Sequence, residues 1–456
     1  MKRSILFLLV PLACTEVQAP TDEGGGIVTA FIGANVVPMD GDRVVERQTV
    51  LVQGSHIVAF GPAADVEVPE GAIEIDAAGK YLMPGLAEMH GHLPSPDMPA
   101  AVTENVLFLY VANGVTTVRG MQGNPSQIPL RERIDRGELL GPRLVLGSPS
   151  MSGQSVTTVE DARRLVREYR EAGFDLLKVH EELSAEVYDA IARTAREIGI
   201  PFAGHVTDRV GLFHALSAGQ TTIDHLDNYV EALVPEGAGP EEAPGLRGAE
   251  KLLTLIDESR IPQVVQATLD ADASVVPTMV LWESGIYATR PSAELLAERT
   301  EVRYMPKDMV DRWIAAVDER VAESDPENLR QLAGLRRRIL SALHQGGVRI
   351  LLGTDSPQIF SVPGFSIHRE MALYVELGMT PFEVLSSGSR VVGDYFGENF
   401  GSIAVGESAD LILVDGNPLE DVKNVSRISG VMVRGRYISR EDIEKRLSTI
   451  AASYES

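Results

Sequence analysis

The chain has 456 residues, of which 44% are hydrophobic and 23% are charged, a composition that excludes a disordered or fibrous protein and predicts globular domains. Its formal net charge of -24 excludes the basic surface of a nucleic-acid-binding protein, because such a chain repels phosphate backbones. A single cysteine excludes an internal disulfide framework.

Residues 1–26 predict an exported protein. A basic start, a short apolar run and a small residue precede Cys14, which is the layout of a secretory signal. The stretch also resembles a bacterial lipoprotein signal, in which Cys14 would be lipidated and "TDEGGG" would follow as a flexible tether. The resemblance implies a cell-envelope lipoprotein on the periplasmic face of the outer membrane, held to the membrane only through Cys14. The alternative is an ordinary signal peptide cut near Ala19.

Two stretches near opposite ends of the chain predict β structure. Residues 27–82 and 401–440 alternate apolar and polar side chains between glycine, aspartate and asparagine breaks. We expect both stretches to close into one small β-sandwich domain, with residues 441–456 as a helix or tail. Oligomeric state cannot be predicted from these patterns.

Residues 83–400 alternate short apolar strands with helical patterns, as in 159–173 and 184–199. The expected strands lie at 86–92, 115–120, 143–148, 174–180, 200–206, 220–226, 273–280 and 348–355. Eight strand–helix units predict an α/β fold, a (β/α)8 TIM-type barrel. Two insertions, 230–250 and 284–343, are expected to cover the mouth of the barrel, where the loops after the strands lie.

Six polar side chains fall at the carboxyl ends of these apolar strands, at positions His90, His92, Lys178, His205, His225 and Asp355. His90 and His92 share a face because side chains two apart in a strand point the same way. Barrels place their chemistry at this rim. Neutral imidazoles and a carboxylate suit zinc and related divalent ions. Lys178 is not a ligand as an ammonium, but a buried lysine loses its charge readily and can then react with carbon dioxide to give a carbamate.

The segments "HGH", "LLKVH", "AGHV", "IDHL" and "LLGTDSP", with flanks "GKYLMPGLAEMHGH" and "GSIAVGESADLILVDGNPLED", resemble the amidohydrolase superfamily, in particular its imidazolonepropionase-like and Xaa-Pro dipeptidase-like branch. The resemblance spans residues 27–440. It implies that His90, His92 and Asp355 bind one metal ion and that His205 and His225 bind a second. Carboxylated Lys178 would bridge the two. Zinc is the expected ion, with manganese, cobalt and iron as alternatives.

The reaction implied is hydrolysis of a carbon–nitrogen bond in a small substrate such as an N-acyl amino acid, a dipeptide or a cyclic amide. A metal-activated hydroxide would attack the carbonyl, and Asp355 would act as general acid and base. Two alternatives remain open from the residues. The same centre could serve an esterase or phosphotriesterase, or the chain could be a tethered binding protein without turnover.

Four further side chains are candidates for substrate binding, each beside a purely structural alternative. Arg119 could bind a substrate carboxylate or form an ordinary ion pair. Tyr229 could stabilise an oxyanion or simply pack. His180 and His368 could contact substrate or serve as structural histidines near the rim.

Overall fold

The computed structural model describes residues 26–238 and 249–455. The predicted signal segment and its Cys14 therefore lie outside the described residues, apart from Gly26 of the tether. Within the described ranges, no helix combines the length and apolarity needed to cross a membrane.

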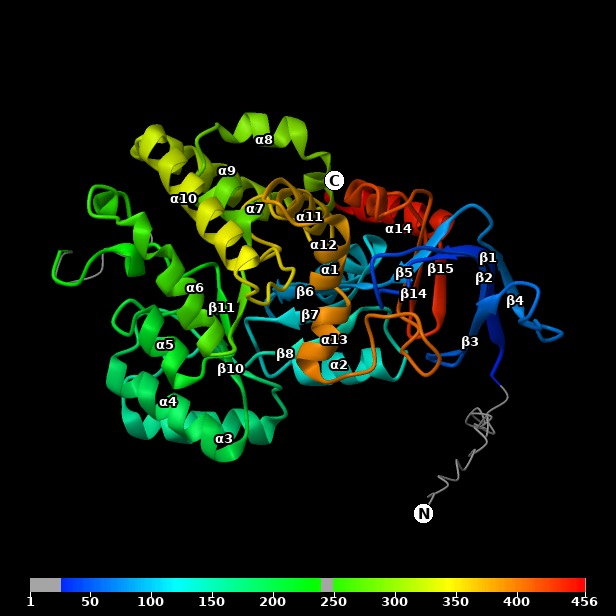
Figure 1. Cartoon of the computed structure of the whole chain (residues 1–456), viewed down its shortest axis with the longest axis horizontal. Coiled ribbons are helices and arrows are strands. Elements are labelled where there is room, and N and C mark those ends of the chain that lie inside the picture. Colours follow the sequence, from blue (N-terminus) through cyan, green and yellow to red (C-terminus); the bar gives the residue numbers. More distant parts are fainter. Residues whose placement is uncertain (1–25, 239–248, 456) are drawn as a thin grey trace, which may run out of the picture.

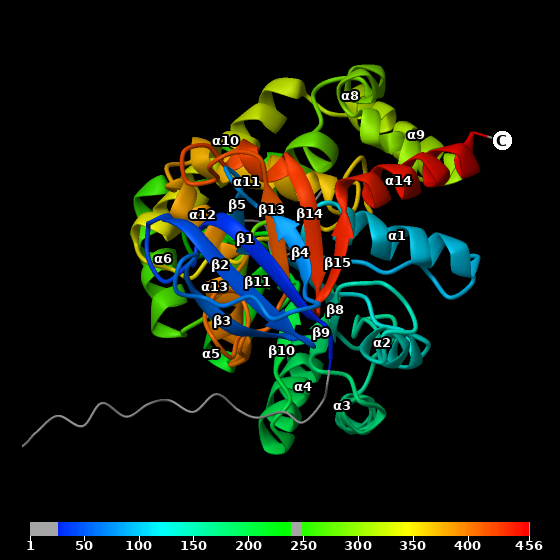
Figure 2. The ribbon, with the colours of Figure 1, turned by 90° about the vertical axis from the view of Figure 1, so that its right-hand side faces the viewer.

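Strands from both ends of the chain share one eight-stranded sheet, on the right of Figure 1. The order is β15-β14-β13-β5-β1-β2-β3, with β4 parallel to β1. The strands are β1 (Val28–Val36), β2 (Val45–Gln53), β3 (His56–Pro62), β4 (Ile73–Asp76), β5 (Tyr81–Pro84), β13 (Leu411–Val414), β14 (Ile428–Val433) and β15 (Arg436–Ser439). Figure 2 shows the early and late strands side by side.

The two ends meet where β5 pairs antiparallel with β13. The alternation seen in the sequence places apolar side chains on a shared buried cluster that includes Phe31, Val50, Leu82 and Met432. Burial of this face is what holds segments so distant in sequence together.

Seven further strands form two parallel sheets, so the predicted α/β class is confirmed. One sheet has the order β6-β7-β8 and the other β12-β11-β10-β9. Their bounds are β6 (Leu86–Gly91), β7 (Val115–Gly120), β8 (Arg143–Leu146), β9 (Leu177–Val179), β10 (Phe202–Gly204), β11 (Thr222–Asp224) and β12 (Ser274–Val276). A parallel bridge between Gly147 and Leu176 links the two sheets.

The eighth predicted strand, at 348–355, differs from expectation. It makes only isolated parallel bridges, from Ile350 to Val275 and from Ser356 to Gly91. Asp355 has a φ of 61°, in the left-handed region, and a residue in that conformation cannot continue a regular ladder. The segment still lies between β12 and β6 through these bridges.

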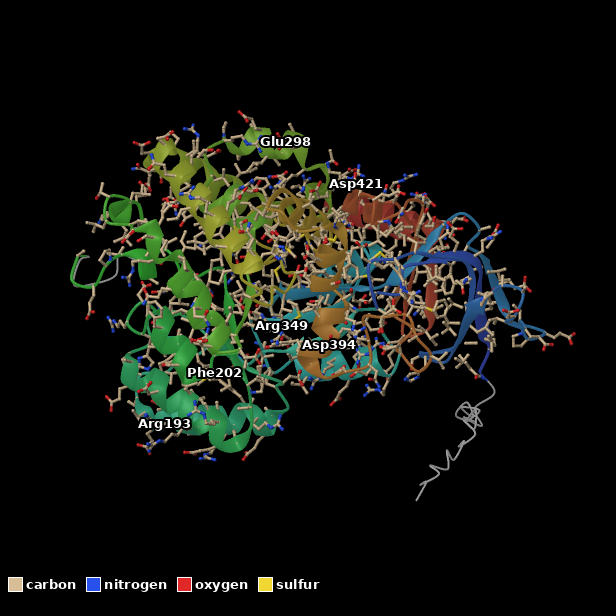
Figure 3. All side chains as sticks on the ribbon, viewed as in Figure 1. Arg193, Phe202, Glu298, Arg349, Asp394 and Asp421 are labelled. Atoms are coloured by element: carbon tan, nitrogen blue, oxygen red, sulfur yellow. The ribbon has the colours of Figure 1, made fainter. Side chains whose placement is uncertain are left out.

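Helices follow the parallel strands: α1 (Ala100–Ala112), α2 (Gln127–Asp135), α3 (Val159–Ala172), α4 (Ala185–Ile198), α5 (Leu212–Ala218), α6 (Ile261–Asp270), α11 (Phe365–Glu376), α12 (Pro381–Ser387) and α13 (Arg390–Phe396). Ser184 caps α4 by accepting from the Val187 N–H, and Gly199 ends it in the left-handed conformation. In Figure 3, Phe202 of β10 and Arg193 of α4 are labelled. The Phe202 ring packs against Tyr188 at 6.0 Å, whereas Arg193 lies on the exposed side of the helix.

The long insertion folds as helices at the top of Figure 1. It contains α8 (Ser292–Glu298), η5 (Thr300–Tyr304), α9 (Lys307–Glu323) and α10 (Pro326–Gln345). The helix α7 (Met279–Leu281) and the π-helical turn η4 (Trp282–Ile286) connect β12 to it, so the end of the seventh strand predicted at 273–280 is helical instead. Shorter turns are η1 (Glu231–Leu233), η2 (Ala249–Leu252), η3 (Glu258–Arg260) and η6 (Val422–Ser426), and α14 (Arg440–Tyr454) comes last.

Candidate metal centre

Three side chains converge where the parallel strands end. His90, His225 and Asp355 each offer a ligand atom, and these atoms lie within 4.8 Å of one another. All three residues are buried. His90 comes from β6, His225 follows β11, and Asp355 follows the extended segment that bridges β12 and β6.

Backbone bonds bring the first and last of these segments together. The Asp355 N–H donates to the His90 carbonyl at 2.8 Å, and the His92 N–H donates to the Ser356 carbonyl at 2.8 Å. As a result the Asp355 carboxylate lies against both histidines of the His-Gly-His motif. Its Oδ1 is 2.5 Å from His92 Nε2 and 3.6 Å from His90 Nε2.

The other two predicted histidines complete a ring of imidazoles. The ring centroids of His90 and His225 are 4.4 Å apart, and those of His205 and His225 are 4.5 Å apart. His225 also lies near the carboxylate, with its Nδ1 3.8 Å from Asp355 Oδ2.

Hydrogen bonds to acceptors outside the ring orient three of the imidazoles. His90 Nδ1–H donates to Asp224 Oδ2 at 2.8 Å, and His205 Nδ1–H donates to Asp227 Oδ2 at 2.7 Å. These bonds leave the Nε2 lone pairs of His90 and His205 available, as metal ligation requires. His225 Nδ1 pairs with Thr278 Oγ1 at 2.8 Å.

Lys178 is fully buried beside this ring, and its Nζ lies 3.4 Å from His90 Nε2. Burial lowers the pKa of the Lys178 ammonium, an effect that the carboxylates of Asp224, Asp355 and Asp227 oppose. The prediction that this lysine belongs to the apolar interior rather than to the surface agrees with its position.

The donor set fits a divalent metal. Burial lowers the pKa values of His90 and His225 well below the ordinary value, and it lowers that of His205 to about 3, so the imidazoles are neutral. Neutral imidazole is the form that binds metal. Two buried ring atoms, His92 Nδ1 and His225 Nε2, have no hydrogen-bond partner, which is costly unless an ion or another group completes them.

The structure separates two of the four substrate-binding candidates from the ring. Arg119 is wholly buried: its Nε donates to the Met89 carbonyl at 2.6 Å, and its Nη2 donates to Asp224 at 3.2 Å. The expectation that Arg119 binds a substrate carboxylate is therefore corrected, because this guanidinium already holds an interior carboxylate. The Tyr229 hydroxyl pairs with Thr268 Oγ1 of α6 at 2.7 Å, so the expected contact with an oxyanion is corrected as well.

The two remaining candidates have different surroundings. His180 lies beside His205, with ring centroids 4.3 Å apart, and its Nδ1 accepts from the Glu181 N–H at 2.8 Å. Burial lowers the pKa of His180 to about 3. His368 lies on α11, and its two ring nitrogens are buried without a hydrogen-bond partner.

Sequence reasoning missed the residues that orient the ligands: Asp224, Asp227, Thr278 and Glu88. A signal existed for the two aspartates, because "TIDHLD" flanks His225 with carboxylates on both sides. Nothing in the local sequence distinguishes Thr278 or Glu88 from ordinary strand residues.

Comparison with known proteins gives one family. Residues 81–438 match the model described as "Amidohydrolase family". Ochratoxinase of Aspergillus niger is 23% identical over 447 residues, covering 89% of this chain and 85% of the relative. Imidazolonepropionase of Shouchella clausii is 24% identical over 459 residues, covering 90% of this chain and 91% of the relative.

Among solved structures, a putative prolidase from Bifidobacterium longum superposes with a TM-score of 0.68 at 23% identity, covering 93% of this chain and 99% of that one. At this identity the likeness concerns the fold.

Proposed function

The chain belongs to the amidohydrolase family, and from this premise we propose that it hydrolyses the amide bond of a small substrate at a centre of two divalent metal ions. The family match confirms two predictions, the amidohydrolase resemblance and an enzyme that acts on carbon–nitrogen bonds. The observation that carries the proposal is the convergence of His90, His225 and Asp355 within 4.8 Å.

The proposal includes the finer architecture. The bridges from Ile350 to Val275, from Ser356 to Gly91 and from Gly147 to Leu176 support one closed (β/α)8 barrel made from the two parallel sheets. Continuous pairing around such a ring leaves no sheet edge near the site. The mixed sheet would then form the accompanying β-sandwich.

His90, His92 and Asp355 would hold one ion, and His205 and His225 would hold the other, with a carboxylated Lys178 between them. When bound, divalent ions of this kind lower the pKa of water to about 7 and polarise a carbonyl oxygen. Zinc fits the imidazole-rich set, and manganese, cobalt or iron would be accepted by the same ligands.

Asp355 is the proposed general base and acid. Among the described residues, His225 Nδ1 at 3.8 Å is the one basic side-chain nitrogen within 4.0 Å that lies nearer its Oδ2 than its Oδ1, so this oxygen can take a proton from the attacking water. The same carboxyl group then delivers the proton to the leaving nitrogen, which departs as a neutral amine. Asp224 and Asp227 keep the imidazoles of His90 and His205 in the Nδ1–H tautomer throughout.

The test is hydrolysis of a panel of N-acyl amino acids and dipeptides by protein purified without chelator, with metal measured by elemental analysis. Asp355→Asn keeps the volume but removes the base, and we expect amide turnover to fall at least about 100-fold. His214→Ala is the matched control, because His214 pairs with Asp189 away from the ring. Full turnover in Asp355→Asn, or full turnover after removal of all metal, would refute the proposal.

A further inference from the structure

A cavity of about 450 Å³ opens beside the imidazole ring. Its wall comes from the segments that follow β9, β10, β11, β12 and the eighth extended segment, and it includes residues Glu181, Asp208, Asp227, Trp282 and Ile359. The cavity therefore lies at the carboxyl ends of the strands, where barrel enzymes bind their substrates. Its volume is within the range of small-molecule sites.

Direct bonds connect this cavity to two of the proposed ligands. Asp227 lines the cavity while its Oδ2 accepts from His205 Nδ1–H at 2.7 Å. Arg336 lines it from α10 and donates to the backbone carbonyl of His225. Asp227 and Arg336 would thus each lie between a molecule in the cavity and a proposed metal-ligand residue.

Carboxyl groups dominate the wall. The charged residues that line the cavity are Glu181, Asp208, Asp227, Glu231 and Glu319 against Arg320 and Arg336. Within residues 26–238 and 249–455, none of the five carboxyl groups has a lysine or arginine nitrogen within 4.0 Å, and Asp227 has only His205. Surface carboxylates often lack partners, but these five line one cavity.

Among the described residues, Arg336 forms no ion pair with these carboxyl groups. The Arg336 guanidinium stacks 3.8 Å above the Trp282 ring, and its Nη2 is engaged by the His225 carbonyl. Only 2% of Arg336 is exposed. This guanidinium supports the wall by a cation–π contact. Its charge opposes the rise in the pKa values of Asp227 and Glu231, but it forms no ion pair with either carboxyl group, so the cavity keeps an excess of carboxyl groups.

Buried polar atoms on the wall lack partners as well. Asp227 Oδ1, Trp282 Nε1 and Arg336 Nε are fully buried and make no hydrogen bond. The first is an acceptor and the other two are donors. Since unpaired buried polar atoms are rare and costly, an occupant that donates an N–H to Asp227 Oδ1 would satisfy the one unpaired acceptor of this wall.

The carboxyl groups also raise one another's pKa values. Burial raises the pKa of Glu231 to about 7, and the charges of Asp208 and Asp227 add to the effect. Burial and the same two aspartates raise the pKa of Glu181. A cation placed among these groups would relieve both the repulsion and the cost of burial.

We propose that this cavity binds the cationic end, an ammonium or guanidinium group, of an amide substrate whose carbonyl lies at the metal centre. The inference rests on the proposed amide hydrolysis and names the substrate class for it: N-acyl or peptidyl derivatives of basic amino acids. Glu231 and Asp208 face the cation, and Asp227 lies between it and the metal ligands.

The experiment compares N-acetyl-L-arginine with N-acetyl-L-citrulline, which has nearly the same shape and no charge. The parent protein should prefer the arginine compound by about tenfold or more in kcat/KM, because a site built to bind a charged donor discriminates against its neutral analogue. The double variant Asp208→Asn/Glu231→Gln should bring that ratio close to one. Glu376→Gln, on exposed helix surface, is the control and should leave the ratio unchanged.

Calorimetric titration with L-arginine and L-citrulline separates this inference from the proposed function, because it needs no turnover. Selective arginine binding that is lost in the double variant, in a protein that hydrolyses no amide, would support the cation site and refute the function. Hydrolysis without preference, together with equal binding of the two amino acids, would refute the cation site and leave the function standing. A double variant that keeps the parent's selectivity also overturns the inference.

Discussion

Glu88 and Thr354, 266 positions apart in the chain, are joined by two hydrogen bonds. The Thr354 N–H donates to Glu88 Oε1 at 2.7 Å, and the Thr354 hydroxyl donates to Oε2 at 2.5 Å. The same Oε1 accepts from the His90 N–H at 3.0 Å. The Glu88 carboxyl group therefore connects the segment that carries His90 to the segment that carries Asp355.

Replacing this carboxyl group should weaken both the fold and the site. Glu88→Ala leaves two buried N–H donors and a hydroxyl without an acceptor, and each lost partner costs about 1–3 kcal/mol. We expect a loss of about 3 kcal/mol in the free energy of unfolding, measured in urea, together with reduced metal content. Glu88→Gln keeps one acceptor oxygen and should lose less. Equal urea midpoints for Glu88→Ala and the parent would contradict this role.

Arg119 and Asp224 should behave as a coupled pair. Arg119→Met leaves the buried Asp224 carboxylate without its counter-charge. We expect this to lower the free energy of unfolding by about 3–5 kcal/mol. The double variant Arg119→Met/Asp224→Asn should recover part of that loss, since no uncompensated charge remains. Asp224→Asn alone should weaken metal binding by about 10–100-fold, because His90 Nδ1–H then meets a neutral amide in place of a carboxylate. A double-mutant cycle in urea and a metal titration measure the two effects, and additive losses would argue against coupling.

Glu370 predicts a pH dependence of stability. Its oxygens accept from the Met279 and Val280 N–H groups, and burial raises its pKa from 4.5 to about 8. Above pH 4.5 the unfolded state ionises first and releases its proton, so the free energy of unfolding falls as pH rises, up to about pH 8, by a few kcal/mol in order of magnitude.

In Glu370→Gln the side chain does not titrate, so the variant does not share the parent's loss of stability between pH 4.5 and 8. The free energy of unfolding of the variant relative to the parent should therefore rise over this range and stay level above it. Urea unfolding at several pH values measures the difference. Glu376→Gln, on the exposed side of the same helix, should show no such trend. A parent-minus-variant difference that does not change with pH would contradict the assignment.

Lys178→Ala tests the proposed carbamate. Elemental analysis should find about two ions per chain in the parent and about one in the variant, because the bridging group supplies ligands to both sites. Carbon-13 NMR of protein grown with labelled bicarbonate should show a carbamate signal that the variant lacks. Lys307→Ala, on the exposed start of α9, is the control. One ion per chain in the parent, unchanged in Lys178→Ala, would make the lysine structural and the centre mononuclear.

Cys14→Ser tests the proposed lipid anchor. In a Gram-negative host the parent should incorporate labelled palmitate and sediment with membranes, because a diacyl chain adds strong hydrophobic attachment. The variant should incorporate none. A mature parent protein whose first residue lies beyond Ala19 would show instead that an ordinary signal peptide had been removed together with Cys14.

Local pattern was enough to predict that the candidate ligand residues meet at the carboxyl ends of the strands, but not which residues surround them. The alternation of β6 puts His90 and His92 on one face, and an apolar strand around Lys178 predicts its burial. By contrast, the bond between Arg119 and Asp224 depends on which strand lies beside β7 across the interior, which a single sequence does not reveal.

Two further differences have a similar origin. The Tyr229 hydroxyl forms a hydrogen bond with Thr268 because α6 packs beside it, and the periodicity of the sequence does not predict that contact. The sequence predicts a regular eighth strand at 348–355 because most of these residues are apolar. The segment makes only isolated bridges, at Ile350 and at Ser356, and Asp355 between them takes a left-handed φ of 61° that the apolar pattern does not predict.

The sheet shared by both chain ends cannot be completed until the ribosome has synthesised the last strands. The Lys80 ammonium donates to Ser429, 349 positions away, and β5 pairs with β1 on one side and with the late strand β13 on the other. While a ribosome makes the intervening residues, β5 has an open edge that invites pairing with other nascent chains. A growing chain of this protein is therefore at its most vulnerable just before the last strands emerge, and a holding chaperone would be most useful there.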